Sequence, residues 1–539
     1  MKPLWQALMM VRRCDPASFW RRLLYVLLQS VLPLVNLYLL KLLIDSVSLA
    51  VQTGNLSDSL SYLLAIVAIF LCNRIVAALS AVNNDVLGQR LIDYMSDIMQ
   101  QQAARLDMAY YDTPAYHDTL HRAQQEAGSR PVVILNNFMA LFGALLSIGG
   151  VMLLLVSATW WVVLVMLVAV VPSFAVRLYK ARSIYRFRRD NTQHYRRTAY
   201  YSQLLTSRAA AQEMRTYRLA PFFRRLFVDH RRSLVTRLLV ISRRLGAADI
   251  LCAVVEAVAM LAVVWLLITQ ATASAITIGA FVMLFEAFRR GQSYLSSLVA
   301  AIAGLYDNRL FVSNLFEFLS LEPTVLSPEQ PLPLPEHIDQ VEFRDITFRY
   351  PDMQRDVLQH YHLVAQVGEV TLVSGRNGFG KSTLIKLLLR LYDPQEGAVL
   401  INGVDIRRFD LVALRSKMGV LFQDFMRYCC SAGENIALGD LDHLVSSVSQ
   451  AATMAGADTV IEALPKNYDT QLGRLFDGGA ELSMGQWQRI ALARALQSDA
   501  PVLLLDEPTA WLDTDARSHL QQTINSLKTD KIIILITHQ

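Results

Sequence analysis

Cysteines are scarce in this sequence, and their spacing excludes two kinds of small structural site. Only five occur in 539 residues, and none forms a C-x-x-C pair. Neither a disulfide framework nor a zinc site is therefore expected. A cleavable signal segment is not expected either, because the first apolar run, Leu23–Ile44, is too long for one and follows four arginines.

Hydrophobic residues are more frequent in this sequence than in soluble proteins, and Lys and Arg are unevenly distributed between the apolar runs. Hydrophobic residues make up 53% of the chain and the mean hydropathy is +0.31, whereas soluble proteins average about 45–50% apolar residues. The excess lies in the N-terminal part of the chain, which indicates a membrane domain. The formal net charge is +5, but the basic residues flank apolar runs, so nucleic acid is not an expected partner.

Six long apolar segments occur in succession. A membrane-spanning helix needs about 20 mostly apolar residues. One such segment alone could be a buried helix of a soluble protein, but six in a row predict an all-α transmembrane domain of six helices over residues 1–315. The predicted spans are Leu23–Ile44, Leu60–Val82, Val132–Val156, Trp160–Val176, Ile250–Ile268 and Ile276–Leu305.

The distribution of Lys and Arg predicts which connections are cytoplasmic. The connections 46–59, 157–159 and 269–275 contain neither residue, whereas residues 177–244 hold 18 basic and three acidic residues. Residues 88–130 hold four arginines and also side with the cytoplasm, because the rule counts Lys and Arg and not net charge. The chain is therefore expected in the cytoplasmic (inner) membrane, in contact with lipids, with its N-terminus, both long loops and its C-terminal domain in the cytoplasm.

A different pattern begins after the last span. Residues 316–339 are rich in proline, which predicts an extended linker. From Gln340 onwards, short β-branched runs alternate with helical ones, as is typical of an α/β domain with a mainly parallel sheet. The expected fold class is multidomain: a six-helix transmembrane domain followed by an α/β nucleotide-binding domain over residues 340–539.

A glycine-rich loop follows the apolar strand predicted at Val370–Val373 and precedes a helix predicted at Leu384–Leu391. Glycines let backbone N–H groups turn towards phosphates, and the helix N-terminus adds positive potential. The loop therefore predicts ATP binding, with Lys381 reaching the β and γ phosphates and Ser382 holding Mg²⁺ through its hydroxyl. The loop residues expected to contact ATP are Gly375, Asn377, Gly378, Gly380, Lys381, Ser382 and Thr383.

A second apolar strand, residues 502–505, delivers Asp506 and Glu507 at its end. Ligands collect at the carboxyl edge of open α/β sheets. Asp506 is expected to hold Mg²⁺ through its water shell, and Glu507 is expected to be the general base that polarises the attacking water. An Asp-Glu pair at a strand end is common by itself, but beside a phosphate loop it indicates a nucleotide-hydrolysing site.

A third motif, LSMGQWQR at residues 482–489, narrows the class. It resembles the signature sequence of ABC transporters. With six preceding spans on the same chain, the sequence resembles a bacterial half-transporter of the type I exporter family. This resemblance implies a transport-coupled ATPase that works by alternating access, in which ATP closes a dimer of ATPase domains and hydrolysis resets it.

The resemblance also implies roles for single residues. Gln423 would act in catalysis and Mg²⁺ binding, His538 would be the switch histidine, and Tyr350 would stack on adenine. Each ATP would lie between the phosphate loop of one chain and the signature of a second half-transporter. A homodimer is the simpler expectation, and a heterodimer stays open. The residues implied to reach ATP outside the phosphate loop are Tyr350, Ser483, Gly485, Gln486 and Asp513.

Three features depart from the family pattern. Met484 replaces the usual first glycine of the signature, and Trp511 is unusual beside Asp513. The chain also stops at Gln539, directly after His538, where the family continues, which predicts a C-terminally truncated domain. The coupling helices of the family are expected near Tyr111–His117 and Ser207–Tyr217.

The cargo is less determined than the ATPase. The segments 422–428 and 485–488 resemble those of exporters of modified or antimicrobial peptides, including lantibiotics, so a peptide is the expected substrate. A lipid flippase and a multidrug exporter remain alternatives within the exporters. An ABC-type gated channel or regulatory receptor is the alternative from another class, and intact hydrolytic residues disfavour it.

Five charged residues fall inside the predicted spans, where charge is costly and usually faces a cavity or a partner. Glu286 and Arg74 come out at comparable depths. They are expected either to form a structural ion pair or to line a polar cavity, and snorkelling towards the interface is the remaining alternative. The five residues are Arg74, Glu256, Glu286, Arg289 and Arg290.

Overall fold

The computed structural model divides into two compact units, Met1–Ala103 with Thr119–Ser320 and Ala104–Asp118 with Leu321–Gln539. The first unit is helical and the second contains all the strands. The residues that the structure describes are 2–53, 56–113, 120, 130–156, 160–273, 275–351, 353–376, 379–441 and 448–537.

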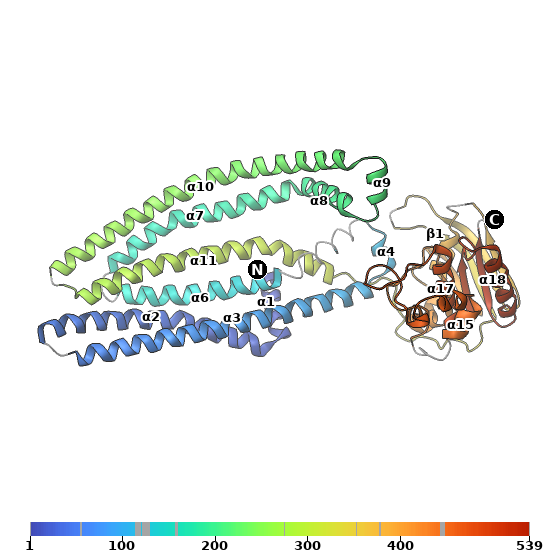
Figure 1. Ribbon diagram of the computed structural model, residues 1–539, viewed down its shortest axis with the longest axis horizontal. Helices are drawn as coiled ribbons and strands as arrows, with labels where there is room; N and C mark the ends of the chain where they lie inside the picture. Colours follow the sequence, from blue (N-terminus) through green and yellow to red (C-terminus); the bar gives the residue numbers. More distant parts are fainter. Residues whose placement is uncertain are drawn as a thin grey trace. The chain divides into compact units, whose positions relative to one another are not determined.

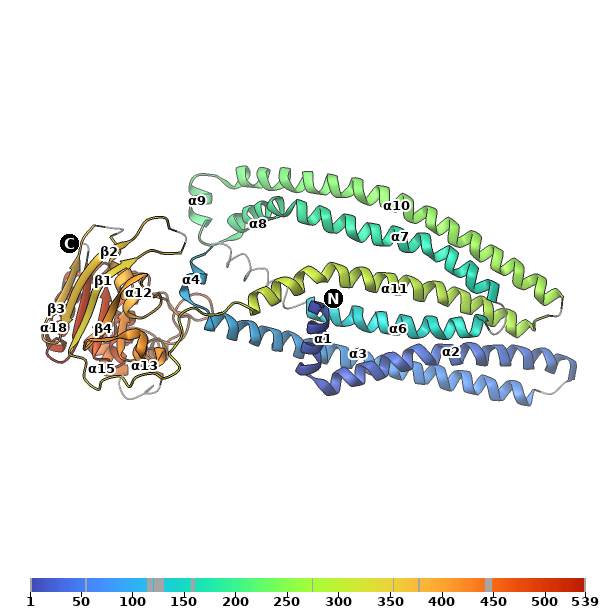
Figure 2. The ribbon, with the colours of Figure 1, turned by 180° about the vertical axis from the view of Figure 1, so that it is seen from behind.

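The first unit consists of long helices that run side by side (Figures 1 and 2). Helix α11 packs against α2, α6 and α7, and α10 packs against α7 and α8. Apolar side chains at these contacts are fully buried, among them Leu37, Val151 and Phe288. The helices are α1 (Lys2–Cys14), α2 (Pro16–Thr53), α3 (Ser57–Arg105), α6 (Arg130–Val156), α7 (Trp160–Asp190), α8 (Thr192–Thr206), α9 (Ala211–Thr216), α10 (Ala220–Thr272) and α11 (Ile278–Leu319).

Each of the six predicted spans falls on a different long helix of this unit. Within the described residues, α2, α3, α6 and α10 are long and apolar enough to cross a membrane. Large apolar side chains such as Leu153 and Leu261 are more than 70% exposed on the outside of the helices, as expected of surfaces that face lipid. The other two predicted spans lie on α7 and α11, so the count of six crossings stays a prediction.

Glu286 of α11 finds its ion-pair partners on its own helix, and one of them, Arg290, also donates to Pro33 O of α2 at 3.4 Å. Glu286 accepts hydrogen bonds from Arg289 Nε at 2.8 Å and from Arg290 Nε at 3.1 Å, the (i, i+3) and (i, i+4) spacing that brings helical side chains together. The Arg74 guanidinium lies 5.4 Å from the ring centroid of Phe70. The structure thus pairs Glu286 within its helix and not with Arg74, because neighbours one turn away meet without any rearrangement of helices.

The second unit contains two four-stranded sheets. One has the order β2-β1-β4-β5 with antiparallel pairs, and the other has the order β3-β8-β7-β6 with parallel pairs only. The predicted α/β domain with a parallel core sheet is confirmed. The strands are β1 (Gln340–Phe348), β2 (Leu358–Gln366), β3 (Val370–Ser374), β4 (Glu396–Ile401), β5 (Val404–Asp405), β6 (Met418–Leu421), β7 (Val502–Asp506) and β8 (Ile532–Thr537).

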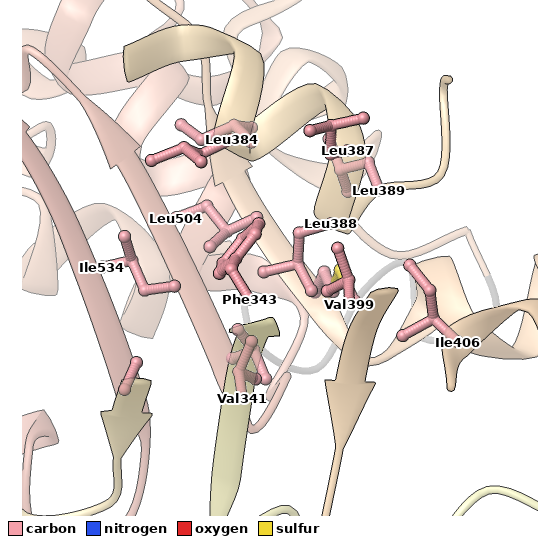
Figure 3. Packing of buried hydrophobic residues seen from close by; sticks show 14 of the residues in the cluster. Val341, Phe343, Leu384, Leu387, Leu388, Leu389, Val399, Ile406, Leu504 and Ile534 are labelled. Atoms are coloured by element: carbon pink, nitrogen blue, oxygen red, sulfur yellow. The ribbon is translucent and has the colours of Figure 1, made fainter. Parts of the chain in front are cut away.

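Buried leucines of α12 join the two sheets into one core. Figure 3 shows Phe343 of β1 close to Leu388 of α12 and Leu504 of β7, and all three are at most 1% exposed. Strand β7 is buried along its whole length, which explains its apolar run Val502–Leu505. The helices of this unit are α4 (Met108–Tyr111), α12 (Lys381–Leu388), α13 (Leu411–Ser416), α14 (Ala432–Ala437), α15 (Val448–Met454), α16 (Asp458–Glu462), α17 (Met484–Gln497) and α18 (Thr514–Leu527), with 3₁₀ turns Ile406–Arg408 and Asn467–Asp469.

The segment around α4 belongs to the same unit as the sheets. Asp107 accepts a hydrogen bond from the Thr324 hydroxyl at 2.7 Å, and the Tyr392 hydroxyl donates to Asp112. Burial of Tyr392, together with this bond to Asp112, raises the pKa of Tyr392. Part of the first predicted coupling segment thus packs with the α/β unit, and its residues 114–117 lie outside the described part of the chain.

Helix α11 continues to Leu319, and strand β1 begins at Gln340. The domain bounds at residues 315 and 340 stay predictions. Helix α7 continues past residue 177 to Asp190. The short helix α9 lies inside the second predicted coupling segment.

Candidate functional site

The four parallel strands end level with one another at one edge of their sheet. Ser374 of β3 pairs with Thr537 of β8, Asp506 of β7 pairs with Ile536, and Leu421 of β6 pairs with Leu505. The carboxyl edge of such a sheet is where ligands bind. The predicted residues that follow the four strand ends are the loop from Gly375, then His538, Glu507 and Gln423.

The phosphate loop ends at a position that only glycine fits. Gly380 precedes α12 with φ +77°, and a Cβ there would approach Val357 Cγ1 to 2.7 Å. Left-handed backbone is readily adopted by glycine and is strained for other residues. The predicted residues Asn377 and Gly378 lie outside the described part of the chain, as does His538.

Lys381 is the first residue of α12, and only 8% of it is exposed. Its ammonium donates hydrogen bonds to the carbonyl oxygens of Gly375 and of Thr537, the latter at 3.2 Å. These bonds hold the ammonium group between the first residue of the loop, Gly375, and the end of β8. A phosphate at the N-terminus of α12 would meet this cation together with backbone N–H groups.

A cleft of about 620 Å³ opens beside this loop. Tyr350 does not line it, but lines a separate cleft of about 370 Å³ with Asp112 and Lys386. The Tyr350 hydroxyl hydrogen-bonds to Thr383 Oγ1 at 3.0 Å, and its ring meets the Tyr392 ring edge-on at 5.3 Å. Adenine stacking on Tyr350 therefore stays a prediction. The 620 Å³ cleft is lined by Asp356, Val357, Leu358, Gln359, Tyr361, Val373, Ser374, Gly375, Arg376, Phe379, Lys381 and Leu384.

The two predicted carboxylates differ in their backbone conformation. Asp506 is the last residue of β7 and is 3% exposed. Glu507 has φ +51°, a left-handed conformation that costs a residue with a side chain about 1–3 kcal/mol. Its N–H donates to Ile536 O at 3.0 Å, and its carbonyl accepts from Ala510 N at 3.2 Å. Strain of this kind persists where surrounding bonds hold it, and it is common at functional sites.

The signature residues form the start of α17. Ser483 caps the helix: its hydroxyl accepts from Gln486 N at 3.3 Å, and its own N–H donates to Gln486 Oε1 at 2.9 Å. A Cβ at Gly485 would approach Trp511 O to 2.5 Å, so glycine allows the close approach of α17 and the segment around Trp511. Met484 is 38% exposed, which explains how the signature accommodates a side chain where the family pattern has glycine.

Gln488 and Arg489 lie within the 482–489 motif but received no predicted role, and they tie α17 to the loop after β7. Gln488 is 3% exposed and donates to Glu507 O at 3.0 Å. Arg489 forms an ion pair with Asp513 at 2.9 Å, and the Asp513 carboxylate also caps α18 by accepting from Ala516 N. The Asp513 carboxylate thus bonds to two groups of its own chain, the Arg489 guanidinium and the Ala516 N–H. The sequence signal for Gln488 is its place in the 482–489 motif, between Trp487 and Arg489.

Arg494, also on α17, orders the segment that follows Gln423. It donates to Met426 O at 3.1 Å and to Asn435 O at 2.8 Å, and its guanidinium lies 4.6 Å from the ring centroid of Tyr428. Burial lowers the pKa of Arg494. Gln423 itself is exposed, two residues beyond the end of β6.

The donor set at this edge suits a hard cation such as Mg²⁺. Ser382, Asp506 and Gln423 offer oxygen atoms, which Mg²⁺ prefers, and the ion usually keeps waters and phosphate ligands instead of an all-protein cage. The described residues contain no cluster of three or more His, Cys, Asp or Glu that could hold a metal.

Residues 358–510 match the family model for the ABC transporter. The α/β unit carries an ABC transporter domain. The chain is 27% identical to the subtilin transport ATP-binding protein SpaT of Bacillus subtilis, over 100% of this chain and 88% of that protein. It is 26% identical to the nisin transport ATP-binding protein NisT of Lactococcus lactis, over 94% of this chain and 84% of that protein.

The ABC transporter domain and the helical unit together have the fold of a known exporter. A bacterial Atm1-family ABC exporter with ATP bound superposes with a TM-score of 0.77 at 22% identity, over 97% of this chain and 92% of that one. An ATP-dependent lipid A-core flippase of Syntrophus aciditrophicus is 34% identical over 48% of this chain and 41% of its own length. The expected fold class, a helical membrane domain followed by an α/β nucleotide-binding domain, is confirmed apart from the number of six spans, and the chain is a multi-pass membrane protein with a transport-coupled ATPase domain.

Proposed function

We propose that this chain is one half of an ATP-driven peptide exporter that works as a dimer. The observation that carries the proposal is the similarity to SpaT, which extends over the whole chain and therefore includes the helical unit as well as the ATPase. The two units also have the fold of an exporter. A binding module without turnover would not need the buried lysine and the two carboxylates at one sheet edge.

Hydrolysis in this proposal uses the residues at the carboxyl edge of the parallel sheet. Lys381 and the loop N–H groups bind the β and γ phosphates, and Glu507 accepts a proton from the attacking water. In the sequence, Gln423 follows strand β6 and His538 follows strand β8. Bound Mg²⁺ would neutralise phosphate charge, held by Ser382, Asp506 and Gln423. A positioned general base typically contributes about 10²–10⁴-fold to the rate.

The ATP site is proposed to be shared between two chains. The residues that line the 620 Å³ cleft beside Lys381 include none of the signature residues. The N-terminus of α17 nevertheless carries partial positive charge and backbone N–H groups suited to an anion. A second half-transporter, in the simplest case another copy of this chain, would place Ser483, Gly485 and Gln486 against the phosphates of the first.

The proposed location is the cytoplasmic membrane, with the N-terminus and the ATPase domain inside. The Lys and Arg content of the connections supports this orientation. It also gives the ATPase access to cytoplasmic ATP. Six crossings, including those on α7 and α11, form part of the proposal.

A peptide is proposed as cargo because the two relatives that align over most of their length are named for the transport of subtilin and nisin. A lipid flippase is the second candidate. Lipid A-core flippases show higher identity, 34%, but over only about half of this chain. Similarity restricted to part of a chain says less about cargo than similarity that includes the membrane helices.

Mixed dimers test the shared site. One chain carries Lys381→Ala and the other Ser483→Arg, so that a mixed dimer keeps one intact composite site and each homodimer keeps none. We expect ATP hydrolysis to reappear in the mixed dimer, purified through two different tags, while both homodimers stay inactive. If phosphate loop and signature served ATP within one chain, mixing would restore nothing.

Cargo-stimulated ATPase activity in proteoliposomes tests the cargo. We expect hydrophobic or cationic peptides of the lantibiotic class to raise the hydrolysis rate, and lipid A analogues and small amphiphilic drugs to leave it unchanged. The Glu507→Gln protein serves as the control for background hydrolysis. Stimulation by lipid alone would favour the flippase, and ATP-gated ion flux without cargo stimulation would favour a channel.

A further inference from the structure

The buried side chain of Gln488 holds two points of one backbone turn. Its amide nitrogen donates to Glu507 O at 3.0 Å, and its amide oxygen accepts from Trp511 N at 3.1 Å. The two contacts bracket the segment that begins with the candidate general base. Because Gln488 is 3% exposed, water does not readily replace either bond.

This turn has a conformation that needs support. Glu507 lies in left-handed backbone with φ +51°, which a glutamate adopts only where neighbouring groups hold it. Its carbonyl accepts a second hydrogen bond from Ala510 N at 3.2 Å. At the other end, Gly485 brings α17 against the Trp511 carbonyl, where a Cβ would come within 2.5 Å. The helix and the turn therefore meet at two places that depend on side-chain type.

A residue that only filled space here would not need an amide. Burying a polar group costs free energy unless it is hydrogen-bonded, and both ends of the Gln488 amide bond to backbone atoms of the same turn. An apolar side chain of the same length would fill the volume without holding Glu507. The geometry therefore points to orientation as the reason for a glutamine.

We propose that Gln488 is a positioning residue for ATP hydrolysis, which holds the backbone of Glu507 so that its carboxylate points at the attacking water. The inference rests on the proposed role of Glu507 as general base. Gln488 lies on the helix whose first turn carries Ser483 and Gly485. It therefore ties the orientation of Glu507 in one ATP site to the position of the signature that reaches the other.

The test compares Gln488→Met with Gln497→Met in the full-length protein in lipid. Both glutamines are buried and lie on α17, but Gln497 is at the opposite end of the helix from the signature. We expect Gln488→Met to lower kcat by about 10- to 100-fold, the loss that follows from a small misplacement of a reacting group. The KM for ATP should change less than about twofold, because the phosphate loop is untouched. Gln497→Met should keep the parental kcat.

The same substitution in the Glu507→Gln background separates positioning from loss of structure. If Gln488 acts through Glu507, it should lower the residual rate no further once the base is gone. An unchanged kcat in Gln488→Met would overturn the inference. A further loss of rate in the double variant would also overturn it. A third contradicting outcome is a fall in kcat that comes with an equal loss of ATP binding and with a lower Tm than that of Gln497→Met.

A second variant of Gln488 covers the case that Gln488→Met fails to fold, and the Glu507→Gln protein tests the role of Glu507 separately. If Gln488→Met does not fold, Gln488→Glu retains the length and the acceptor for Trp511 N but loses the donor to Glu507 O, and the same fall in kcat is expected. If Glu507→Gln itself hydrolyses ATP at the parental rate, the proposed function of Glu507 fails. If Glu507→Gln is inactive and both Gln488 variants are fully active, only the present inference fails.

Discussion

Replacing Glu507 by glutamine should leave ATP bound and reduce its hydrolysis by about 10²–10⁴-fold, the usual contribution of a general base. The substitution keeps the shape of the side chain and removes only the carboxylate that would accept the proton. Glu507 N–H bonds to Ile536 O, and its carbonyl accepts from Gln488. These backbone contacts do not depend on the side-chain charge, so the fold of the turn should persist.

The measurement is single-turnover hydrolysis alongside equilibrium binding of a fluorescent ATP analogue. Glu462→Gln is a matched control, because Glu462 is an exposed glutamate at the end of α16 and should retain the parental rate. Trapped ATP should also stabilise the dimer of the Glu507→Gln protein against dissociation. Hydrolysis at close to the parental rate would show that another group acts as the base.

Replacing Lys381 by alanine should weaken ATP binding itself, by about 10- to 100-fold, since hydrogen bonds to charged groups contribute about 1.5–3 kcal/mol. Lys381 is buried at the start of α12, and its ammonium lies against the carbonyl oxygens of Gly375 and Thr537. An incoming phosphate would meet this cation at the N-terminus of the helix. Alanine leaves the helix intact and removes the charge.

Binding of the ATP analogue should report this loss, with thermal unfolding measured without nucleotide to check the fold. Lys417→Ala is the control: Lys417 precedes β6 at the opposite edge of the parallel sheet from the phosphate loop. It should bind ATP as the parent does. Equal affinities of the Lys381→Ala and parental proteins for ATP would remove Lys381 from the proposed site. The Glu507→Gln and Lys381→Ala proteins together distinguish a loss of hydrolysis from a loss of ATP binding.

Several parts of the fold were predictable because they depend on neighbouring residues. The apolar run of β7 follows from its burial on both faces, and the phosphate loop follows from glycines between a strand and a helix. Gly380 adopts left-handed backbone where this loop meets α12, a conformation that favours glycine. Even the ion pairs of Glu286 with Arg289 and Arg290 follow from helical spacing, whereas a pair with Arg74 would join two helices.

Other features depended on contacts between distant segments. The bond between Tyr392 and Asp112 joins residues 280 apart, which places the segment around α4 in the α/β unit instead of with the neighbouring helices. Nothing in the local pattern of either segment indicates this contact. Likewise, Asp513 accepts from Arg489 of α17 and from the N-terminus of α18, a contact that the sequence does not indicate, and its predicted contact with ATP stays a prediction.

The sequence by itself determined the class of this protein: apolar helices followed by an α/β ATPase domain, with the residue types expected to bind and hydrolyse ATP. These follow from composition, periodicity and short motifs, whose physical causes act within a few residues. Only the tertiary structure decided that the four strand ends lie level at one edge, and that Gln488 holds the backbone of Glu507. Strand register and buried hydrogen bonds depend on which distant segments pack together. The donor and the acceptor of such a bond must be buried next to each other, since a buried polar group without a partner costs free energy.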